Sequence, residues 1–151
     1  MKSSVTIFFL LAIALNACFL FKEYKRSSFS YTANGQTVAV PLVVPKGFLK
    51  EESRDTVGVS YKSFYYKDGS VLYAAYVTDT LVSLQPFDER MHQPQLHRLG
   101  GTVYKGQDEK ELFYREIRQG NLRFGYRLVP EAAELLFDSA TNFASLQKPL
   151  R

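Results

Sequence analysis

Three short turn motifs, each set between runs of alternating apolar and polar residues, constrain the fold of this chain most tightly. Each motif contains a glycine, which can adopt the positive φ that a tight hairpin turn requires. The motifs are Asn34-Gly35, Lys67-Asp68-Gly69-Ser70 and Gln119-Gly120. The runs that they join are residues 28–33 with 36–44, residues 57–66 with 71–77, and residues 111–118 with 121–129. The sequence therefore predicts three antiparallel hairpins.

Alternation within these runs indicates which strand faces are buried. One face of residues 38–44 is entirely apolar, and Pro41 within this run indicates an edge strand or a bulge because proline cannot donate a ladder hydrogen bond. In residues 57–77, apolar and aromatic side chains occupy both faces, so both should be partly covered. Residues 102–105 predict a further short strand, whereas the charged residues 49–55 predict a loop.

The period of the pattern changes after Val129-Pro130-Glu131. Proline suits the first position of a helix, and the following glutamate complements the positive end of the helix dipole. Apolar residues then recur with helical spacing to about residue 147, before Pro149. They are Ala133, Leu136, Phe137, Ala140 and Phe143. The fold class that follows is α+β: a mostly antiparallel β-sheet built from consecutive hairpins, with one C-terminal amphipathic helix packed on a face.

Residues 78–101 are the longest stretch without a strand pattern. They include two prolines, both histidines and Gly100-Gly101. Loops of this length in a small domain usually carry function or are flexible, and a short helix between residues 86 and 99 is an alternative.

The sequence Val43-Val44-Pro45-Lys46-Gly47-Phe48, after an apolar strand and together with the C-terminal helix, resembles PsbP-like domains. The match covers a handful of residues. It implies a related fold as an alternative, and it transfers no functional residue to this chain.

The N-terminal segment predicts where the protein resides. Lys2 precedes the apolar run 5–15, which has the length of a signal-peptide core. The run ends in Leu15-Asn16-Ala17-Cys18, which places a small residue directly before the only cysteine. This segment resembles the lipobox of bacterial lipoproteins. The resemblance implies cleavage before Cys18 and fatty acylation of that cysteine, for example by palmitate.

An uncleaved N-terminal transmembrane anchor is the main alternative, and a signal peptide that is cleaved without lipidation is a further one. Residues 19–21 continue the apolar run, and residues 5–21 reach the short end of what spans a bilayer. Three basic residues follow within five positions, and for a simple anchor this bias favours a cytoplasmic C-terminal side. For a lipoprotein, Phe19 rather than aspartate after Cys18 favours the outer membrane.

The domain organisation follows from these assignments. We expect a signal peptide over residues 1–17, a lipidated N-terminus and tether over residues 18–30, and a single globular α+β domain over residues 31–151. The formal charge of +4 is scattered along the chain, so no nucleic-acid partner is predicted. Cys18 is the only cysteine, which excludes an intramolecular disulfide.

Candidate metal ligands are limited to two histidines. His92 and His97 lie in the 78–101 stretch, but a metal site needs three or four ligands in fixed geometry, so neither a metal nor another cofactor is predicted. The chain also lacks the glycine-rich, nucleophile-elbow and zinc-binding motifs of common enzyme classes. We therefore expect no enzymatic activity.

Two groups of carboxylates could suggest acid–base chemistry. Asp68 and Asp79 could form a pair, although Asp68 is explained by its turn. Glu111 and Glu116 lie on a predicted strand among arginines, an arrangement typical of an exposed, charge-paired face. Neither group is expected to form a catalytic site.

Tyrosine is the most suggestive residue type for binding, because it combines apolar area with a polar tip. It is also a favourable strand residue, and sheet packing is the simpler interpretation. The tyrosines on predicted strands are Tyr61, Tyr65, Tyr66, Tyr73, Tyr76, Tyr104, Tyr114 and Tyr126.

The sequence thus predicts a bacterial envelope lipoprotein with a small, non-enzymatic binding or structural domain. Its partners would be the membrane, through a lipid at Cys18, and another envelope protein. The alternative is a ligand-binding or minor enzymatic domain that uses residues 78–101 as a lid.

Overall fold

The structure, a computed structural model, describes residues 23–79, 84, 94–97 and 100–147. Within these residues the chain forms nine strands and one helix. They are β1 (Tyr24–Ala33), β2 (Gln36–Pro45), β3 (Phe48–Thr56), β4 (Val59–Tyr66), β5 (Val71–Val77), β6 (Gln95–Leu96), β7 (Thr102–Gln107), β8 (Phe113–Gln119), β9 (Leu122–Val129) and α2 (Glu131–Leu146). All the pairings between these strands are antiparallel. The prediction of a mostly antiparallel sheet with one C-terminal helix is confirmed.

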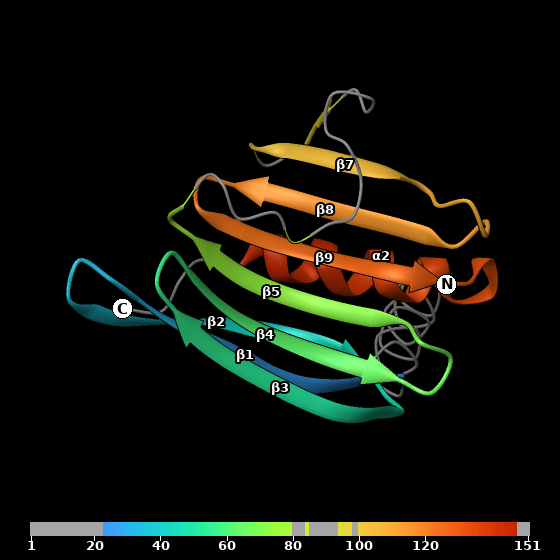
Figure 1. Cartoon of the computed structure of the whole chain (residues 1–151), viewed down its shortest axis with the longest axis horizontal. Coiled ribbons are helices and arrows are strands. Elements are labelled where there is room, and N and C mark those ends of the chain that lie inside the picture. The colour runs from blue at the N-terminus through green and yellow to red at the C-terminus, as the bar shows by residue number, and fades with distance from the viewer. Residues whose placement is uncertain (1–22, 80–83, 85–93, 98–99, 148–151) are drawn as a thin grey trace, which may run out of the picture.

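Seven strands form one sheet in the order β3-β4-β5-β9-β8-β7-β6 (Figure 1). The predicted β4–β5 and β8–β9 hairpins both lie within it. The pairing of β5 with β9 joins these two hairpins in the middle of the sheet, although they are distant in sequence. The two halves of the chain therefore form one continuous surface.

The first predicted hairpin is confirmed, but it forms a separate two-stranded sheet of β1 and β2. Asn34 and Gly35 have φ angles of 52° and 75°, the left-handed conformation that a type I′ turn needs at both positions. Pro41 pairs with Ser28 in this two-stranded sheet, where both strands are edges.

Strand β1 begins at Tyr24, whereas the sequence predicted a tether as far as residue 30. The serine-rich composition suggested little to bury, yet Phe29 is 2% exposed in the core. Its polar neighbours Ser28 and Ser30 lie on the exposed face of the same strand. Residues 24–30 thus belong to the folded domain.

The predicted loop over residues 49–55 is wrong, because these residues form most of strand β3. Both faces of β3 are largely exposed, so its sequence shows no apolar alternation. Leu49 lies between the paired positions Phe48 and Lys50, where the register shifts. Charged side chains commonly protect an edge strand from pairing with other chains. In β3 they replace the apolar alternation from which a strand could have been predicted.

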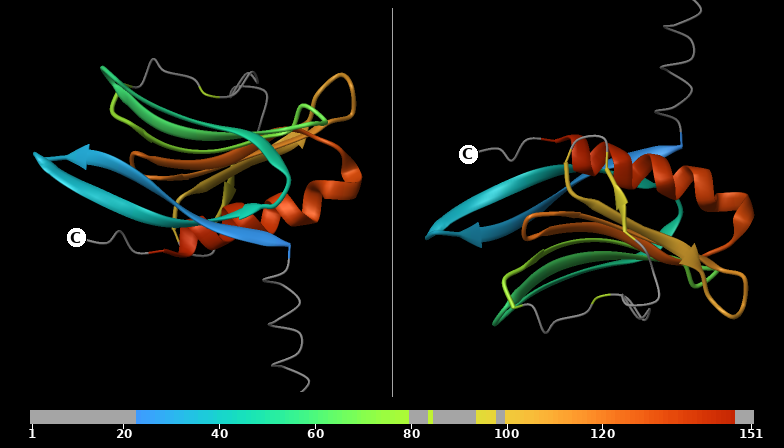
Figure 2. Two further views of the ribbon diagram at one scale, coloured as in Figure 1. Left: turned by 90° about the horizontal axis from the view of Figure 1, so that it is seen from below. Right: turned by 90° about the horizontal axis from the view of Figure 1, so that it is seen from above.

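The hydrophobic core lies between the seven-stranded sheet and a second layer, which consists of the β1–β2 hairpin and α2 (Figure 2). The hairpin contributes Phe29, Tyr31, Val40, Leu42 and Val44, the sheet contributes Phe64, Leu72, Ala74, Phe124, Tyr126 and Val129, and α2 contributes Phe137, Ala140 and Ala144.

Polar contacts also join the layers. The Lys62 ammonium and the Tyr66 hydroxyl each donate to a hairpin carbonyl, those of Ser28 and Pro45, at 2.8 Å.

Helix α2 begins directly after β9, with Pro130 as its N-cap. Glu131 and Glu134 lie in the first turn, where they complement the positive end of the helix dipole. The Phe137 ring packs edge-on against Tyr66 and Tyr126, with ring centroids 5.0 Å and 5.7 Å apart. This aromatic group joins α2 to two strands of the sheet.

Several predictions fall on residues whose structure is not described. They include Cys18 and the rest of residues 1–22, most of the helix suggested for residues 86–99, and Pro149. Within that stretch, Gln95 and Leu96 form the short edge strand β6. Among the described residues, no helix is long and apolar enough to cross a membrane.

Replacing Phe137 by alanine should lower the free energy of unfolding by about 3–5 kcal/mol, because it removes a buried ring from between the layers. Denaturant unfolding of a chain without residues 1–22 measures this loss. Leu135→Ala is the control, since Leu135 is 79% exposed on the same helix and should change stability by about 0.5 kcal/mol or less. Equal losses in both variants would contradict the packing of α2 described here.

Candidate functional site

A groove lies between α2 and the β6–β7–β8 side of the sheet. It is open to solvent and has a volume of about 470 Å³. It combines polar and charged side chains with apolar walls. The residues that line it are Gln95, Leu96, His97, Val103, Lys105, Arg115, Asp138, Asn142 and Leu146.

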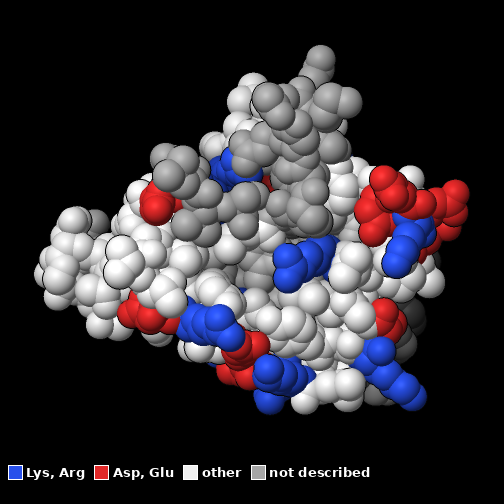
Figure 3. All heavy atoms as spheres, viewed as in Figure 1, with Lys and Arg blue, Asp and Glu red and all other residues white. Residues whose placement is uncertain are grey.

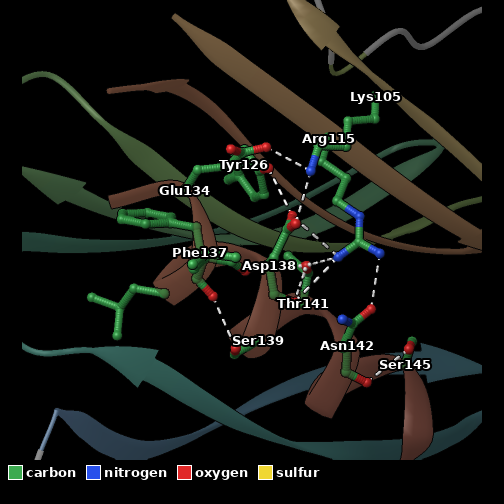
Figure 4. A network of polar contacts seen from close by, with 12 residues as sticks. Lys105, Arg115, Tyr126, Glu134, Phe137, Asp138, Ser139, Thr141, Asn142 and Ser145 are labelled. Carbon is green, nitrogen blue, oxygen red and sulfur yellow. Dashed lines mark hydrogen bonds and ion pairs between the residues drawn. The ribbon is translucent and has the colours of Figure 1, made fainter. Parts of the chain in front are cut away.

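Arg115 forms the inner end of this groove. It lies on β8 and is 8% exposed, with its guanidinium directed at α2 (Figure 4). It donates hydrogen bonds to the Thr141 hydroxyl at 3.0 Å, to the Asn142 side-chain carbonyl at 2.9 Å and to the Asp138 backbone carbonyl at 3.2 Å. A buried guanidinium requires such partners, so these bonds fix α2 relative to β8.

Asp138 accepts bonds from three strands of the sheet. The Tyr126 hydroxyl on β9 and the Lys105 ammonium on β7 each donate to its carboxylate at 2.8 Å. The Arg115 guanidinium on β8 forms an ion pair with it at 3.4 Å. Lys105 also contacts Glu134, one turn earlier on α2, at 2.6 Å. The charges around the groove are therefore largely compensated within the protein.

The environment of this network fixes its protonation. Burial raises the pKa of the Tyr126 hydroxyl, and its bond to the Asp138 carboxylate raises it further. Partial burial acts to lower the pKa of Lys105, but the hydrogen bonds to Asp138 and Glu134 outweigh it and raise the pKa. Both groups thus keep their protons at neutral pH and act as donors to Asp138.

His97 is one of the two candidate histidines, and it lines the groove. Its backbone is held by hydrogen bonds to Gly100 and Gly101 at 3.1 Å. Its Nδ1 atom is buried and has no hydrogen-bond partner among the described residues. His92 lies outside the described residues. Within the described residues, no three His, Cys, Asp or Glu side chains lie close enough to hold a metal ion.

The prediction of an exposed, charge-paired face around Glu111 and Glu116 holds for the exposure of Glu111 and for the pairing of Glu116 with Arg118, but it is wrong for the exposure of Glu116. Glu116 is 2% exposed on the sheet face opposite α2, where it accepts from Tyr73 at 2.5 Å and from Arg118 at 2.6 Å. Tyr73, Gly125 and Glu116 lie side by side on three adjacent strands. A Cβ at Gly125 would collide with the Tyr73 ring, so glycine lets tyrosine cross β9 to reach Glu116.

Glu111 lies before β8 rather than in it, in the loop that follows β7. Its φ of 61° is supported by the Asp108 carboxylate, which accepts from the backbone of Lys110 and Leu112. The other carboxylate pair is not brought together either, since Asp68 and Asp79 lie beyond opposite ends of β5. Asp68 accepts from the Ser70 backbone within its turn.

The strand tyrosines are divided between the two faces of the sheet. Tyr66, Tyr76 and Tyr126 lie on the side of α2 and the hairpin, where they pack on or within the core. On the opposite face, a smaller pocket of about 180 Å³ contains three further tyrosines. It is lined by Tyr61, Ser63, Tyr65, Val71, Tyr73, Leu84 and Arg127. Sheet packing therefore accounts for the first group, and the second surrounds a polar hollow.

Charged residues of both signs are interspersed over this opposite face (Figure 3). Along β3, Glu52 forms ion pairs with Lys50 and Arg54, both at 3.2 Å. The described residues of this face therefore form no broad surface of a single charge for a polyanion.

Comparison of the chain with protein-family models, with curated proteins and with solved structures returned no match. The resemblances to lipoprotein signals and to PsbP-like domains therefore stay predictions.

The groove was not predicted as a site. Arg115 was considered only as one of the arginines near Glu111 and Glu116, and Asp138 was not singled out. Neither residue carries a local motif, because their partners lie on elements distant in sequence. None of the described residues that line the groove carries a hydroxyl or thiol group. The Thr141 hydroxyl is buried beneath it, where it bonds to Arg115 and to the carbonyl of Phe137.

Replacing Asp138 by asparagine should lower the free energy of unfolding by about 1–3 kcal/mol, because Lys105 and Arg115 lose a shared anionic acceptor. The matched control is Glu134→Gln, which removes one contact to the half-exposed Lys105 and should cost about 1 kcal/mol or less. Urea unfolding at neutral pH compares the two. A smaller loss for Asp138→Asn than for Glu134→Gln would contradict the central position of Asp138.

Proposed function

We propose that this protein is a bacterial envelope lipoprotein, anchored through Cys18, whose α+β domain acts by binding rather than by catalysis. The observation that carries the proposal is Leu15-Asn16-Ala17-Cys18 at the end of a signal-like apolar run. The outer membrane is the favoured location because Phe19 follows the cysteine. An uncleaved transmembrane anchor formed by the same run is the alternative.

The position of β1 is compatible with a closely held membrane domain. The Tyr24 hydroxyl donates to the backbone carbonyl of Leu136 at 3.1 Å, and the Lys46 amide donates to the Glu23 carbonyl at 2.9 Å. These bonds fix the chain to the domain from residue 23 onwards. The proposed lipidated residue therefore precedes the folded domain by only a few residues.

We also propose that the amphipathic helix α2 serves to cover the sheet and not to recognise a partner through its apolar stripe. Phe137 and Ala140 on this stripe are 3% and 1% exposed. Their apolar area is already occupied by the core, which supports a structural role. Partner recognition would then use exposed parts of the domain.

Replacing Cys18 by serine should abolish labelling of the protein by a fatty-acid analogue and leave an unprocessed precursor. The measurement is metabolic labelling in a bacterial host, with mass analysis of the N-terminus. Phe19→Ser is the control: it also introduces a serine into the apolar run, but it leaves the cysteine and the residues before it intact. Labelling of the Phe19→Ser variant should persist.

Two results would contradict the lipoprotein assignment. One is labelling that survives Cys18→Ser. The other is a wild-type membrane protein whose N-terminus is still Met1, which would support the uncleaved anchor.

A second candidate function is binding of a small ligand in the groove, with part of residues 78–101 as its wall. Gln95, Leu96 and His97 come from that stretch and line the groove. Arg115 and Asp138 place opposite charges beside each other there, at 3.4 Å. A zwitterionic ligand, for example a free amino acid or a short peptide, presents both a carboxylate and an ammonium, and it would compete with this ion pair for its two members.

Titration with a panel of free amino acids and dipeptides, followed by amide chemical shifts, tests this second function. Binding in the groove should move the resonances of Val103, Lys105 and Asn142 in a saturable way. Val57, which is fully exposed at a distant turn, serves as the internal control. Shifts that do not saturate, or that affect Val57 equally, would contradict a specific site.

A further inference from the structure

We infer that the exposed face of helix α2, together with the start of β1, lies against the lipid headgroups of the membrane that holds the protein. The inference rests on the proposed membrane anchorage, and it holds for either form of the anchor. It assigns a partner, the bilayer surface, to one side of the domain.

The first argument is the length of chain outside the folded domain. Only residues 19–23 separate Cys18 from Tyr24, and a fully extended chain of this length spans about 20 Å. An uncleaved anchor that ends at residue 21 would leave an even shorter connection. Tyr24 is therefore confined to the neighbourhood of the bilayer surface.

The second argument is the side of the domain from which the chain emerges. Strand β1 begins on the side formed by α2 and the hairpin, away from β3, β4 and β5 (Figure 2). The hydrogen bond from the Tyr24 hydroxyl to the Leu136 carbonyl, at 3.1 Å, places this starting point at the middle of α2. The side of α2 that faces away from the core is thus nearest to the anchor.

The third argument is the composition of that outward side. Leu135 and Leu146 are 79% and 56% exposed, and they lie 11 residues apart. At about 100° per residue, they point in nearly the same direction, roughly 16 Å apart along the helix. Leu135 lies about 180° from the buried Ala144, and Leu146 lies about 180° from the buried Phe137. The helix therefore carries two exposed leucines on the side opposite the residues that pack into the core.

The remaining side chains fit an interfacial position. Ser139 is exposed between the two leucines on the helix, and Glu131, at its first residue, is exposed on the same side. Leu146 and Asn142 also line the groove, where Asn142 is bonded to Arg115. Lys25 and Arg26 are exposed where β1 begins. Exposed leucines beside basic residues suit the boundary between acyl chains and anionic headgroups.

The experiment uses the full-length, membrane-attached protein with single cysteines introduced at exposed positions. Leu135→Cys and Leu146→Cys report on the inferred face. Val57→Cys is the matched control, because Val57 is an equally apolar, fully exposed residue in the turn between β3 and β4. Each cysteine is labelled with bimane, and the protein is reconstituted into vesicles of phosphatidylethanolamine and phosphatidylglycerol. These vesicles contain phosphatidylcholine with a nitroxide at the headgroup or at a shallow acyl position.

We expect bimane at positions 135 and 146 to lose most of its fluorescence on addition of the nitroxide lipid, while bimane at position 57 retains it. Equal quenching at all three positions, or quenching confined to position 57, overturns the inference. All three residues are exposed in the structure, so labelling should leave the fold intact, and circular dichroism verifies this.

The outcomes for the anchor and for the orientation are distinguishable. Acylation blocks the Cys18 thiol, so labelling of the wild-type protein by bimane would count against lipidation. In that case the quenching experiment is carried out with the Cys18→Ser variant. Recovery of the wild-type protein in the soluble fraction overturns both the anchorage and the inference. A membrane-bound protein with unquenched bimane at positions 135 and 146 overturns the orientation alone.

Discussion

The pairing of β5 with β9 is the interaction on which the rest of this structure depends. It joins two groups of locally connected strands into one seven-stranded sheet, so that β4 and β5, which the hairpin contacts, lie beside β8 and β9, which α2 contacts. The pairing closes a long loop, which carries an entropic cost that local hairpins avoid. Buried side chains on both faces offset this cost. On the face opposite α2, Tyr73 crosses Gly125 to reach Glu116, so one polar contact links three strands.

The second layer depends on that sheet in two ways. Apolar contact places Phe137 between Tyr66 and Tyr126, while Arg115 and Asp138 connect α2 to β7, β8 and β9 through hydrogen bonds. Apolar packing is non-directional, whereas a buried guanidinium is stable only where specific acceptors meet it. Our interpretation is that the core supplies most of the stability and the polar network selects the orientation of the helix. The groove beside Arg115 is the space that this orientation leaves open.

The proposed function and the further inference concern different parts of the chain but share one geometric constraint. The segment that resembles a lipoprotein signal ends only a few residues before β1, and β1 starts beside the middle of α2. A short connection limits the orientations that a domain can take at a membrane, because it prevents the domain from turning freely above its anchor. The side that bears Leu135 and Leu146 would then face lipid. The groove lies between α2 and the edge of the sheet, at the border of that side.

The sequence by itself determined the local elements, because hairpin turns and helix starts depend on neighbouring residues. Asn34-Gly35, Asp68-Gly69 and Gly120 located the turns, and Val129-Pro130-Glu131 located the start of α2. The sequence did not predict β3, because too few of its side chains are buried for an alternating apolar pattern to appear. The tertiary structure alone decided the β5–β9 pairing, the separation of the first hairpin from the main sheet and the meeting of Arg115 with Asp138. These are contacts between residues distant in sequence, and they depend on how whole elements match in shape and charge, so no local pattern records them.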